Sequence, residues 1–548
     1  MAARPVFHRF GGMSLCVAAG LMLGSPMSAQ TVVPVVAQAE PAPTAALNAF
    51  RGAIAEAAQD DAAIAAFYRD RDYTAFWTGS GDGARRAALM QVLAGAGMHG
   101  LPARRYDPAE LIGAFRAART EGDRGRLEVR MTRAFLDYAR DVQTGALVPA
   151  RVVPGIVREV PLRDRRANLD DFAAAEPAAF LATLPPRSQE YVRLMKARMT
   201  LETAVAEDRW GAPVPAKSLE PGATGPALIA LRERLVAMGY LPVNAAASYD
   251  ATIRKAVASF QADHGLDVNG VAGANTMAEI NTPPAKRLAA VIVAMERERW
   301  LNMERGRRHI WVNLADYTAQ IVDDGRVTFQ TRAVVGATKE DKNTPEFSHR
   351  MTYMELNPDW TVPGGIIKRD YLPKLQANPN ALGHLDLIDR RGKVVPRGSV
   401  NFAAYSASNF PFNLRQKPGD GNALGRVKFM FPNPYAIYLH DTPEKHLFSR
   451  EVRAYSSGCV RLNDPFEFAY ELLSRQEADP KAVFHKVLDS RRQERITLKD
   501  PVPVHLEYRT AFADAKGRMQ FRRDIYGRDA LIFQALIKAG VVTEAAGS

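Results

Sequence analysis

The spacing of hydrophobic residues changes once along the chain, and this change constrains the fold more than any other feature. Between Leu47 and about Pro213, apolar residues recur at intervals of three and four, as in AAIAAFYRDRDYTAFW and VRMTRAFLDYARDVQTGALVP. Such spacing is typical of amphipathic helices. After Trp300, apolar and polar residues alternate in HIWVNLADYTAQIVDDGRVTFQTRAVVG, where Asp324-Gly325 indicates a hairpin turn. We therefore predict a multidomain α+β protein with a helical scaffold domain over residues 47–215.

A β-rich domain is expected over residues 287–490. It begins with an amphipathic helix, RLAAVIVAMERERWL, and contains strand-like stretches at 427–431 and 435–440. Between Trp360 and Asn422 the periodicity is weak, and Pro, Gly and Asn are frequent. Long inserts of this kind are usually functional loops, so a lid is predicted at about 365–420, with a passive excursion as the alternative. Residues 491–548 are expected to form a C-terminal extension.

The N-terminus has the pattern of a secretory signal peptide over residues 1–29. A basic start with Arg4 and Arg9 precedes an apolar stretch, Leu15 to Leu23, which small residues follow. This stretch is shorter than the ~20 residues that span a bilayer. An uncleaved anchor is the alternative. Residues 30–46 are rich in Ala, Pro and Val and predict a disordered linker.

Residues 218–281 form a compact unit of three short helical patterns. Leu228, Leu231 and Leu235 mark the first helical face, and Ile253 and Phe260 belong to the second. Together with AVASFQADHGL and the Asn-Gly-Val-x-Gly-x-x-Thr stretch that follows, this unit resembles a peptidoglycan-binding domain of the three-helix type. The resemblance implies binding to the cell wall, and the alternative is a helical linker domain that has lost its ligand.

Two side chains in the β-rich domain have the chemistry of acyl transfer. A strand is expected to end at His440, and nineteen residues later Cys459 follows Ser456-Ser457-Gly458. The chain has two cysteines, and removal of the signal peptide would leave Cys459 alone, as a reactive thiol or a buried inert one. A thiol becomes a good nucleophile when an imidazole takes its proton. Gly458 allows a close backbone approach, and N–H groups turned inward there could hold an oxyanion.

The residues of this motif resemble the catalytic signature of YkuD-type L,D-transpeptidases, in which a His is followed by Ser-x-Gly-Cys-x-Arg. Ser457, the Asn-Pro-x-Trp-x-Val-Pro stretch at 357–363 and the C-terminal VPVHLEYRTAFADAKG resemble the large periplasmic YcbB-type branch. The resemblance implies that Cys459 is the nucleophile and His440 its base. It further implies that the backbone carbonyl of Asp441 orients His440.

The remaining candidate site residues are expected to contact the substrate. These are Tyr438, Trp360, Ser457, Gly458 and Arg461. Trp360 could instead pack in a core, and Arg461 could instead anchor the loop through an ion pair. His446 is a weaker candidate for the base. No cofactor is expected, and no metal site either, because His, Cys and carboxylates do not cluster at ligand spacing.

The resemblance implies that a peptidoglycan tetrapeptide is the acyl donor, with D-Ala released, and that the diamino acid of a second stem is the acceptor. The product would be a 3→3 cross-link made in the periplasm. Water as the acceptor would instead give a carboxypeptidase or endopeptidase, and a wall-binding scaffold without catalysis is a third hypothesis. The net charge of +12 favours anionic partners, but the Arg residues are spread along the chain near Ala-rich stretches, so codon bias is the favoured alternative. Nucleic acid is not expected, because no basic run is interleaved with aromatics, and no stable membrane span is expected once the signal is cleaved.

Overall fold

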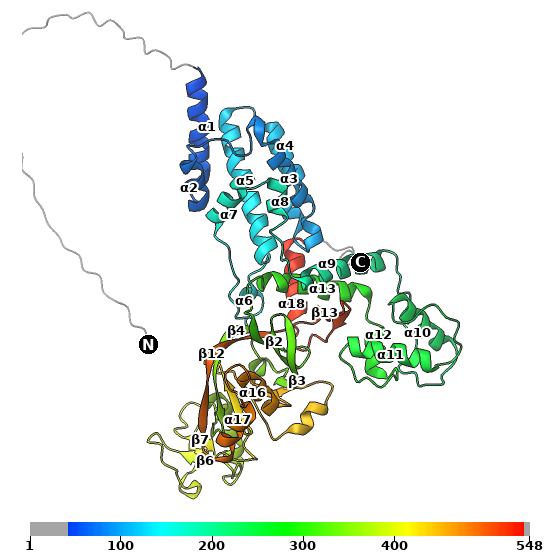
Figure 1. The fold of residues 1–548 in the computed structure, drawn as a ribbon, viewed down its shortest axis with the longest axis vertical. Helices are drawn as coiled ribbons and strands as arrows, with labels where there is room; N and C mark the ends of the chain where they lie inside the picture. The colour runs from blue at the N-terminus through cyan, green and yellow to red at the C-terminus, as the bar shows by residue number, and fades with distance from the viewer. Residues whose placement is uncertain (1–41, 542–548) are drawn as a thin grey trace, which may run out of the picture. The chain divides into compact units, whose positions relative to one another are not determined.

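The N-terminal half of the protein is helical (Figure 1). The computed structural model describes residues 42–541. Its first nine α-helices are α1 (Ala42–Ala58), α2 (Ala62–Asp70), α3 (Gly83–Ala94), α4 (Pro108–Ala117), α5 (Glu121–Thr144), α6 (Pro149–Val152), α7 (Arg165–Ala174), α8 (Pro177–Leu181) and α9 (Gln189–Ala206). The expected signal peptide lies outside the described residues, and α1 begins inside the segment expected to be a linker.

Helix α5 is delimited by sequence signals at both ends. The Thr120 hydroxyl accepts a hydrogen bond from the Asp123 amide, while the Asp123 carboxylate accepts one from the Thr120 amide. This reciprocal pair satisfies N–H groups that the helix itself cannot bond. Gly145, at φ +94°, ends the helix. The apolar face of α5 packs in a core with Phe67, Trp77 and neighbouring side chains.

The peptidoglycan-binding-like unit contains α10 (Pro226–Ala237), α11 (Ala251–Asp263) and α12 (Ala274–Ile280). The predicted faces are confirmed, since Leu228, Leu231 and Leu235 share one core with Ile253 and Phe260.

Helix α13 (Pro284–Trp300) packs with the helical part of the molecule. It shares a core with α9, with α18 (Arg528–Ala539) and with the hairpin of β13 (Ala511–Ala513) and β14 (Met519–Phe521), and Figure 1 shows these elements grouped together. From its sequence, α13 was expected at the start of the β-rich domain. The helix instead joins this helical core because Leu288, Val291, Ile292 and Met295 are all buried there.

A nine-stranded sheet forms the β-rich domain, in the order β10-β3-β11-β9-β8-β4-β12-β1-β2. Strand β3 also pairs with β2, which closes the sheet on itself. Helices α16 (Pro465–Leu473) and α17 (Pro480–Asp489) contribute Phe468 and Phe484 to its core. The strands are β1 (Arg308–Asn313), β2 (Thr318–Asp323), β3 (Arg326–Gly336), β4 (Phe347–Leu356), β8 (Val427–Met430), β9 (Leu439–His440), β10 (Ala454–Ser456), β11 (Val460–Leu462) and β12 (Glu494–Glu507).

The domain boundary expected at residue 490 is wrong. Strand β12 pairs antiparallel with β4 and parallel with β1, so residues assigned to a C-terminal extension lie in the middle of the sheet. Val504 and Leu506 are fully buried in its core. By contrast, the hairpin at Asp324-Gly325 is confirmed, because Asp323 pairs with Arg326 and both turn residues have positive φ.

The segment between β4 and β8 folds around a core of its own. It contains β5 (Trp360–Thr361), α14 (Gly364–Ile366), a π-helix η5 (Ile367–Tyr371), α15 (Leu372–Ala377), β6 (Asp386–Ile388) and β7 (Asn413–Gln416). The three strands pair in the order β5-β7-β6. Leu375 and Leu414 are fully buried in this core. The weak periodicity of the insertion therefore reflects short elements, which are too brief to show a repeat.

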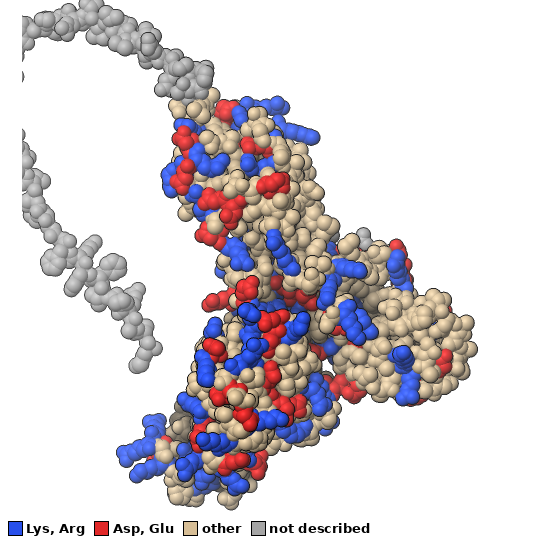
Figure 2. All heavy atoms as spheres, in the orientation of Figure 1, with Lys and Arg blue, Asp and Glu red and all other residues tan. Residues whose placement is uncertain are grey.

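Charged residues of both signs are interspersed on the face drawn in Figure 2, and basic residues do not dominate that face. Among residues 42–541, no helix combines the length and the apolar character needed to cross a membrane.

Candidate active site

Four of the predicted site residues lie at the junction of β9 and β11. These strands are parallel, with Val460 opposite Leu439 and Arg461 opposite His440. Leu439 and Val460 are fully buried in the core of the sheet. Because side chains alternate along a strand, His440 and Arg461 face the opposite side of the sheet.

The residues that precede these strands continue the same pattern. The Val460 amide donates to the Tyr438 carbonyl at 3.1 Å, so Cys459 lies beside Tyr438. The hydroxyl of Tyr438 hydrogen bonds the sulfur of Cys459. His440 lies two residues beyond Tyr438 on its strand and is thus a diagonal neighbour of Cys459, a spacing that side chains can bridge. The fold therefore brings Tyr438, His440, Cys459 and Arg461 together.

His440 is buried and held in one tautomer. Its Nδ1 contacts the Asp441 carbonyl oxygen at 2.5 Å. Because a carbonyl can only accept, Nδ1 carries the proton and Nε2 keeps its lone pair. Burial, reinforced by the positive charge of Arg461, lowers the pKa of His440 to about 3. The ring is thus uncharged at neutral pH.

Asp441 is itself fixed by its surroundings. Its carboxylate accepts hydrogen bonds from the Arg426 amide at 2.9 Å and from Lys445 Nζ at 2.8 Å. Its own amide donates to Val427 at 2.9 Å. The close approach of Gly425, at φ +62°, completes this packing: a Cβ there would lie 2.2 Å from the Asp441 carboxylate.

The thiol of Cys459 is neutral in the resting protein. Burial raises its pKa to about 11, while hydrogen bonds from Tyr438 and the charge of Arg461 act in the opposite direction. The residue keeps partial exposure. Its Sγ donates to the Ala436 carbonyl at 3.6 Å, and among the described residues no hydrogen bond joins it to His440. Ala436 has a positive φ of 54°, and the turn that it makes brings its carbonyl to the sulfur.

The other predicted residues divide between core and surface. Trp360 is buried in the core of the insertion, against which Tyr438 also packs, and its indole hydrogen bonds Tyr438. Arg461 forms an ion pair with Glu444, the alternative that the sequence left open. Ser457 and His446 are exposed.

The Gly458 amide is not free. It donates to the Ser456 hydroxyl at 3.1 Å, and that hydroxyl donates to the Cys459 carbonyl at 2.5 Å. This closes the turn that carries the cysteine.

Sequence reasoning did not identify Thr344. Its hydroxyl donates to the Gly458 carbonyl at 2.7 Å from more than a hundred positions away in the chain. No local pattern marks this contact, because it depends on how β3 and the segment before β4 are brought to the cysteine turn. Within the described part of the chain, no group of three or more His, Cys, Asp or Glu is placed to hold a metal.

Comparison with known proteins identifies three parts of the chain. Residues 307–504 match the model of the L,D-transpeptidase catalytic domain, YkuD. Residues 62–197 match a scaffold domain, and residues 224–280 match the "Putative peptidoglycan binding domain".

One curated relative is a protein of Haemophilus influenzae named "Putative L,D-transpeptidase", which is 33% identical over 252 residues. The match covers 46% of this chain, and the chain spans about half the length of that relative, 50%. A solved L,D-transpeptidase fragment from Xylanimonas cellulosilytica covers 54% of this chain and 100% of its own, at 17% identity and a TM-score of 0.17, too low to support an argument.

The fold, the site and these matches define a class: a multidomain chain with a helical scaffold, a peptidoglycan-binding module and a β-rich YkuD-type catalytic domain. Residues 307–504 thus form a YkuD-type L,D-transpeptidase catalytic domain, which confirms the resemblance predicted from the motif around Cys459. The narrower assignment to the YcbB-type branch stays a prediction.

Proposed function

We propose that the protein is a peptidoglycan L,D-transpeptidase that forms 3→3 cross-links through a thioester on Cys459. The observation that carries the proposal is the cluster of Cys459, Tyr438 and His440 on one face of a YkuD-type domain. The donor is a tetrapeptide stem, and the acceptor is the side-chain amine of a diamino acid in a second stem. We place this reaction in the periplasm, where both stems would be found.

In the first half-reaction, the sulfur of Cys459 attacks the carbonyl carbon of the amide between the third and fourth residues of the donor. The thiol proton passes to Nε2 of His440, whose lone pair is free because Nδ1 is bonded to Asp441. The C–N bond then breaks, and His440 returns the proton to the departing D-Ala amine. A thioester remains.

In the second half-reaction, the acceptor amine attacks the thioester and gives its proton to His440. The C–S bond breaks, and the same proton restores the thiol. Because both groups begin and end neutral, the catalytic pair needs no stable thiolate–imidazolium state before the substrate arrives.

The packing of Tyr438 and Trp360 links the insertion to the site around Cys459. Tyr438 packs both on the core of the sheet and on the core of the insertion. We propose that the insertion forms one wall of the donor groove, while Arg461, ion-paired with Glu444, anchors the neighbouring loop.

The test is intact-mass detection of an acyl adduct on Cys459. Wild-type protein is incubated with disaccharide-tetrapeptide, or with a carbapenem as an irreversible acyl donor, and compared with His440→Ala and Cys459→Ala. We expect an adduct on the wild type, none on Cys459→Ala and a rate at least ~100-fold lower for His440→Ala. An adduct on Cys459→Ala would refute the proposal.

The products separate transfer from hydrolysis. Dimers joined through diamino acids mean transpeptidation, whereas tripeptide alone means that water is the acceptor and that the protein is a carboxypeptidase. A protein that binds sacculi but never forms an adduct would be a wall-binding scaffold.

A further inference from the structure

The hydroxyl of Thr344 lies between two backbone groups of opposite polarity. It accepts a hydrogen bond from the Gly336 amide at 2.9 Å and donates one to the Gly458 carbonyl at 2.7 Å. An amide can only donate and a carbonyl can only accept, so the direction of the hydroxyl proton is determined. Thr344 is fully buried, and water does not compete for either bond.

The second of these bonds fixes one peptide plane. The Gly458 carbonyl and the Cys459 amide belong to the same planar, trans peptide unit, in which C=O and N–H point in opposite directions. A hydroxyl that holds the carbonyl on one side therefore holds the Cys459 N–H toward the other. Gly458 has φ +124°, a conformation that other residues rarely adopt, so the plane could not take this orientation with an ordinary side chain there.

The Cys459 amide is the donor that remains available in this turn. The Gly458 amide is occupied by Ser456. Within residues 42–541, no acceptor receives the Cys459 amide. An unbonded N–H next to the attacking sulfur is placed to meet an oxygen that becomes negative when the sulfur attacks a carbonyl.

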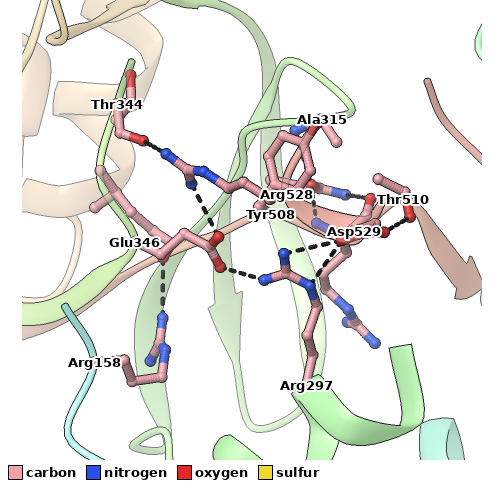
Figure 3. Close-up of polar contacts among 12 residues, drawn as sticks. Arg158, Arg297, Ala315, Thr344, Glu346, Tyr508, Thr510, Arg528 and Asp529 are labelled. Atoms are coloured by element: carbon pink, nitrogen blue, oxygen red, sulfur yellow. Dashed lines mark hydrogen bonds and ion pairs between the residues drawn. The ribbon is translucent and has the colours of Figure 1, made fainter. Parts of the chain in front are cut away.

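A buried ionic cluster binds the backbone carbonyl of Thr344 (Figure 3). Arg528, 2% exposed, donates to the Thr344 carbonyl at 2.7 Å and to Glu346 at 2.9 Å. Arg297 bonds the second oxygen of Glu346 at 2.6 Å and also contacts Asp529. Figure 3 shows Arg528 reaching both Thr344 and Glu346. These groups come from α13, α18 and the segment before β4, so several parts of the chain converge on one residue.

A second hydroxyl holds the other partner of Thr344. Tyr526 donates to the Gly336 carbonyl at 2.6 Å. A Cβ on Gly336 would lie 2.1 Å from the Lys342 carbonyl, so this approach also requires glycine.

We propose that Thr344 is a positioning residue for acyl transfer: its hydroxyl orients the Gly458–Cys459 peptide so that the Cys459 amide stabilises the oxyanion. The inference rests on the proposed function, since it concerns the transition state of the thioester-forming step. Thr344 touches neither substrate nor sulfur in this role.

The experiment compares two reactions of the same sulfur in the full chain. Acylation by a carbapenem passes through an oxyanion, whereas alkylation by iodoacetamide is a direct displacement at carbon and forms none. Thr344→Val keeps the shape of the side chain but removes the hydroxyl. We expect acylation to slow by roughly 10- to 100-fold, which does not exceed the loss of rate caused by removing one oxyanion-hole donor. Alkylation should stay within about twofold of the wild-type rate.

Thr344→Ser is the matched control, because it keeps the hydroxyl and should restore acylation. If Thr344→Val does not fold, Tyr526→Phe provides the test, with a smaller but equally selective loss of acylation. Equal slowing of acylation and alkylation, or unchanged acylation in a variant without the hydroxyl, would overturn the inference. A wild-type protein that is alkylated but never acylated would overturn the proposed function, and this inference with it.

Discussion

The sulfur of Cys459 and the ring of His440 are both uncharged in the resting protein, since the pKa of the thiol is raised to about 11 and that of the imidazole lowered to about 3. Burial is the main cause of both shifts. A neutral thiol resists oxidation and adventitious alkylation better than a thiolate. The resting thiol is therefore protected, and in the proposed reaction proton transfer accompanies attack on the donor.

Two groups of Tyr438 lower the raised pKa of the Cys459 thiol, first its backbone amide and then its hydroxyl. In Tyr438→Phe the ring packing remains, but the hydrogen bond to the sulfur is lost, so the pKa of Cys459 should rise further. A charge-assisted hydrogen bond of ~1.4 kcal/mol corresponds to about a tenfold lower thiolate population. We expect alkylation by iodoacetamide at pH 8–9 to slow by this factor, measured by intact mass over time.

Tyr435→Phe is the control for that measurement, because Tyr435 is 41% exposed and lies on the turn before β9. Its alkylation rate should match the wild type. An unchanged rate in Tyr438→Phe would mean that the hydroxyl does not stabilise the thiolate.

At the scale of single residues, the sequence indicates the reactive side chains but not the groups that orient them. Cys459 and His440 stand out by chemistry and motif, and Tyr438 and Trp360 by resemblance. Thr344 and Ala436 do not, because a hydroxyl or a backbone carbonyl becomes part of a site only through folding. For Arg461 the sequence allowed either a substrate contact or an ion pair, and the structure has an ion pair with Glu444.

The turn between β7 and β8 is the element that holds Asp441, and Gly425 is its tightest point. Gly425→Ala would force a non-glycine residue into φ +62°, at ~1–2 kcal/mol, and push its Cβ into the Asp441 carboxylate. Since the carbonyl of Asp441 holds His440, we expect acylation to fall by more than about tenfold, with a lower thermal midpoint in calorimetry.

Gly421→Ala, in the same turn, serves as the comparison. No atom lies within 4 Å of the Cβ that it would add, and its φ is not positive. This variant should keep wild-type acylation. Loss of activity in both variants would show that the turn, rather than the contact with Asp441, is what matters.

Elements with a local repeat were predictable, whereas those defined by distant partners were not. Helices α5 and α11 follow from the spacing of their apolar residues, and the β2–β3 hairpin from Asp324-Gly325. Strand β12 was assigned to an extension because its partners, β4 and β1, are far away in the sequence. Helix α16 begins directly after Asp464, a residue type that favours helix N-caps, but its carboxylate accepts hydrogen bonds from Thr331 and Asn463 instead of capping the helix.

At the scale of the whole molecule, a histidine joins the peptidoglycan-binding module to the C-terminal hairpin. His264, at the end of α11, stacks on Phe260 at 3.8 Å and on Phe521 of β14 at 5.6 Å between ring centroids. Burial lowers its pKa well below 6.5, and the positive charges of Arg287 and Arg522 add to this effect. The junction thus requires a neutral ring.

The sign of the resulting pH dependence follows from proton linkage. Below pH 6.5 the unfolded chain binds a proton at His264 that the folded protein does not, so the stabilising contribution is fully present above pH 6.5 and decreases as the pH falls. The slope is at most ~1.4 kcal/mol per pH unit. His99, with its pKa lowered to about 4, and His440 act in the same direction.

We expect urea midpoints to fall between pH 7 and pH 5, and to fall less steeply in His264→Phe, where no proton can bind. His349→Gln, at an exposed position of β4, should keep the wild-type slope. Identical slopes for all three proteins would contradict the assignment of this acid sensitivity to His264.

The position of β12 has a consequence for how the protein is made. The start of β1 leaves the ribosome almost two hundred residues before the end of β12, and β11 about 45 residues before it, yet the strand that bridges β4 and β1 is β12. Until then the sheet stays open, with unpaired edges at β4 and β1, and such edges invite aggregation. The helical scaffold is synthesised long before β12 and can fold first. Completion of the sheet then depends on the late pairing of β12 between β4 and β1.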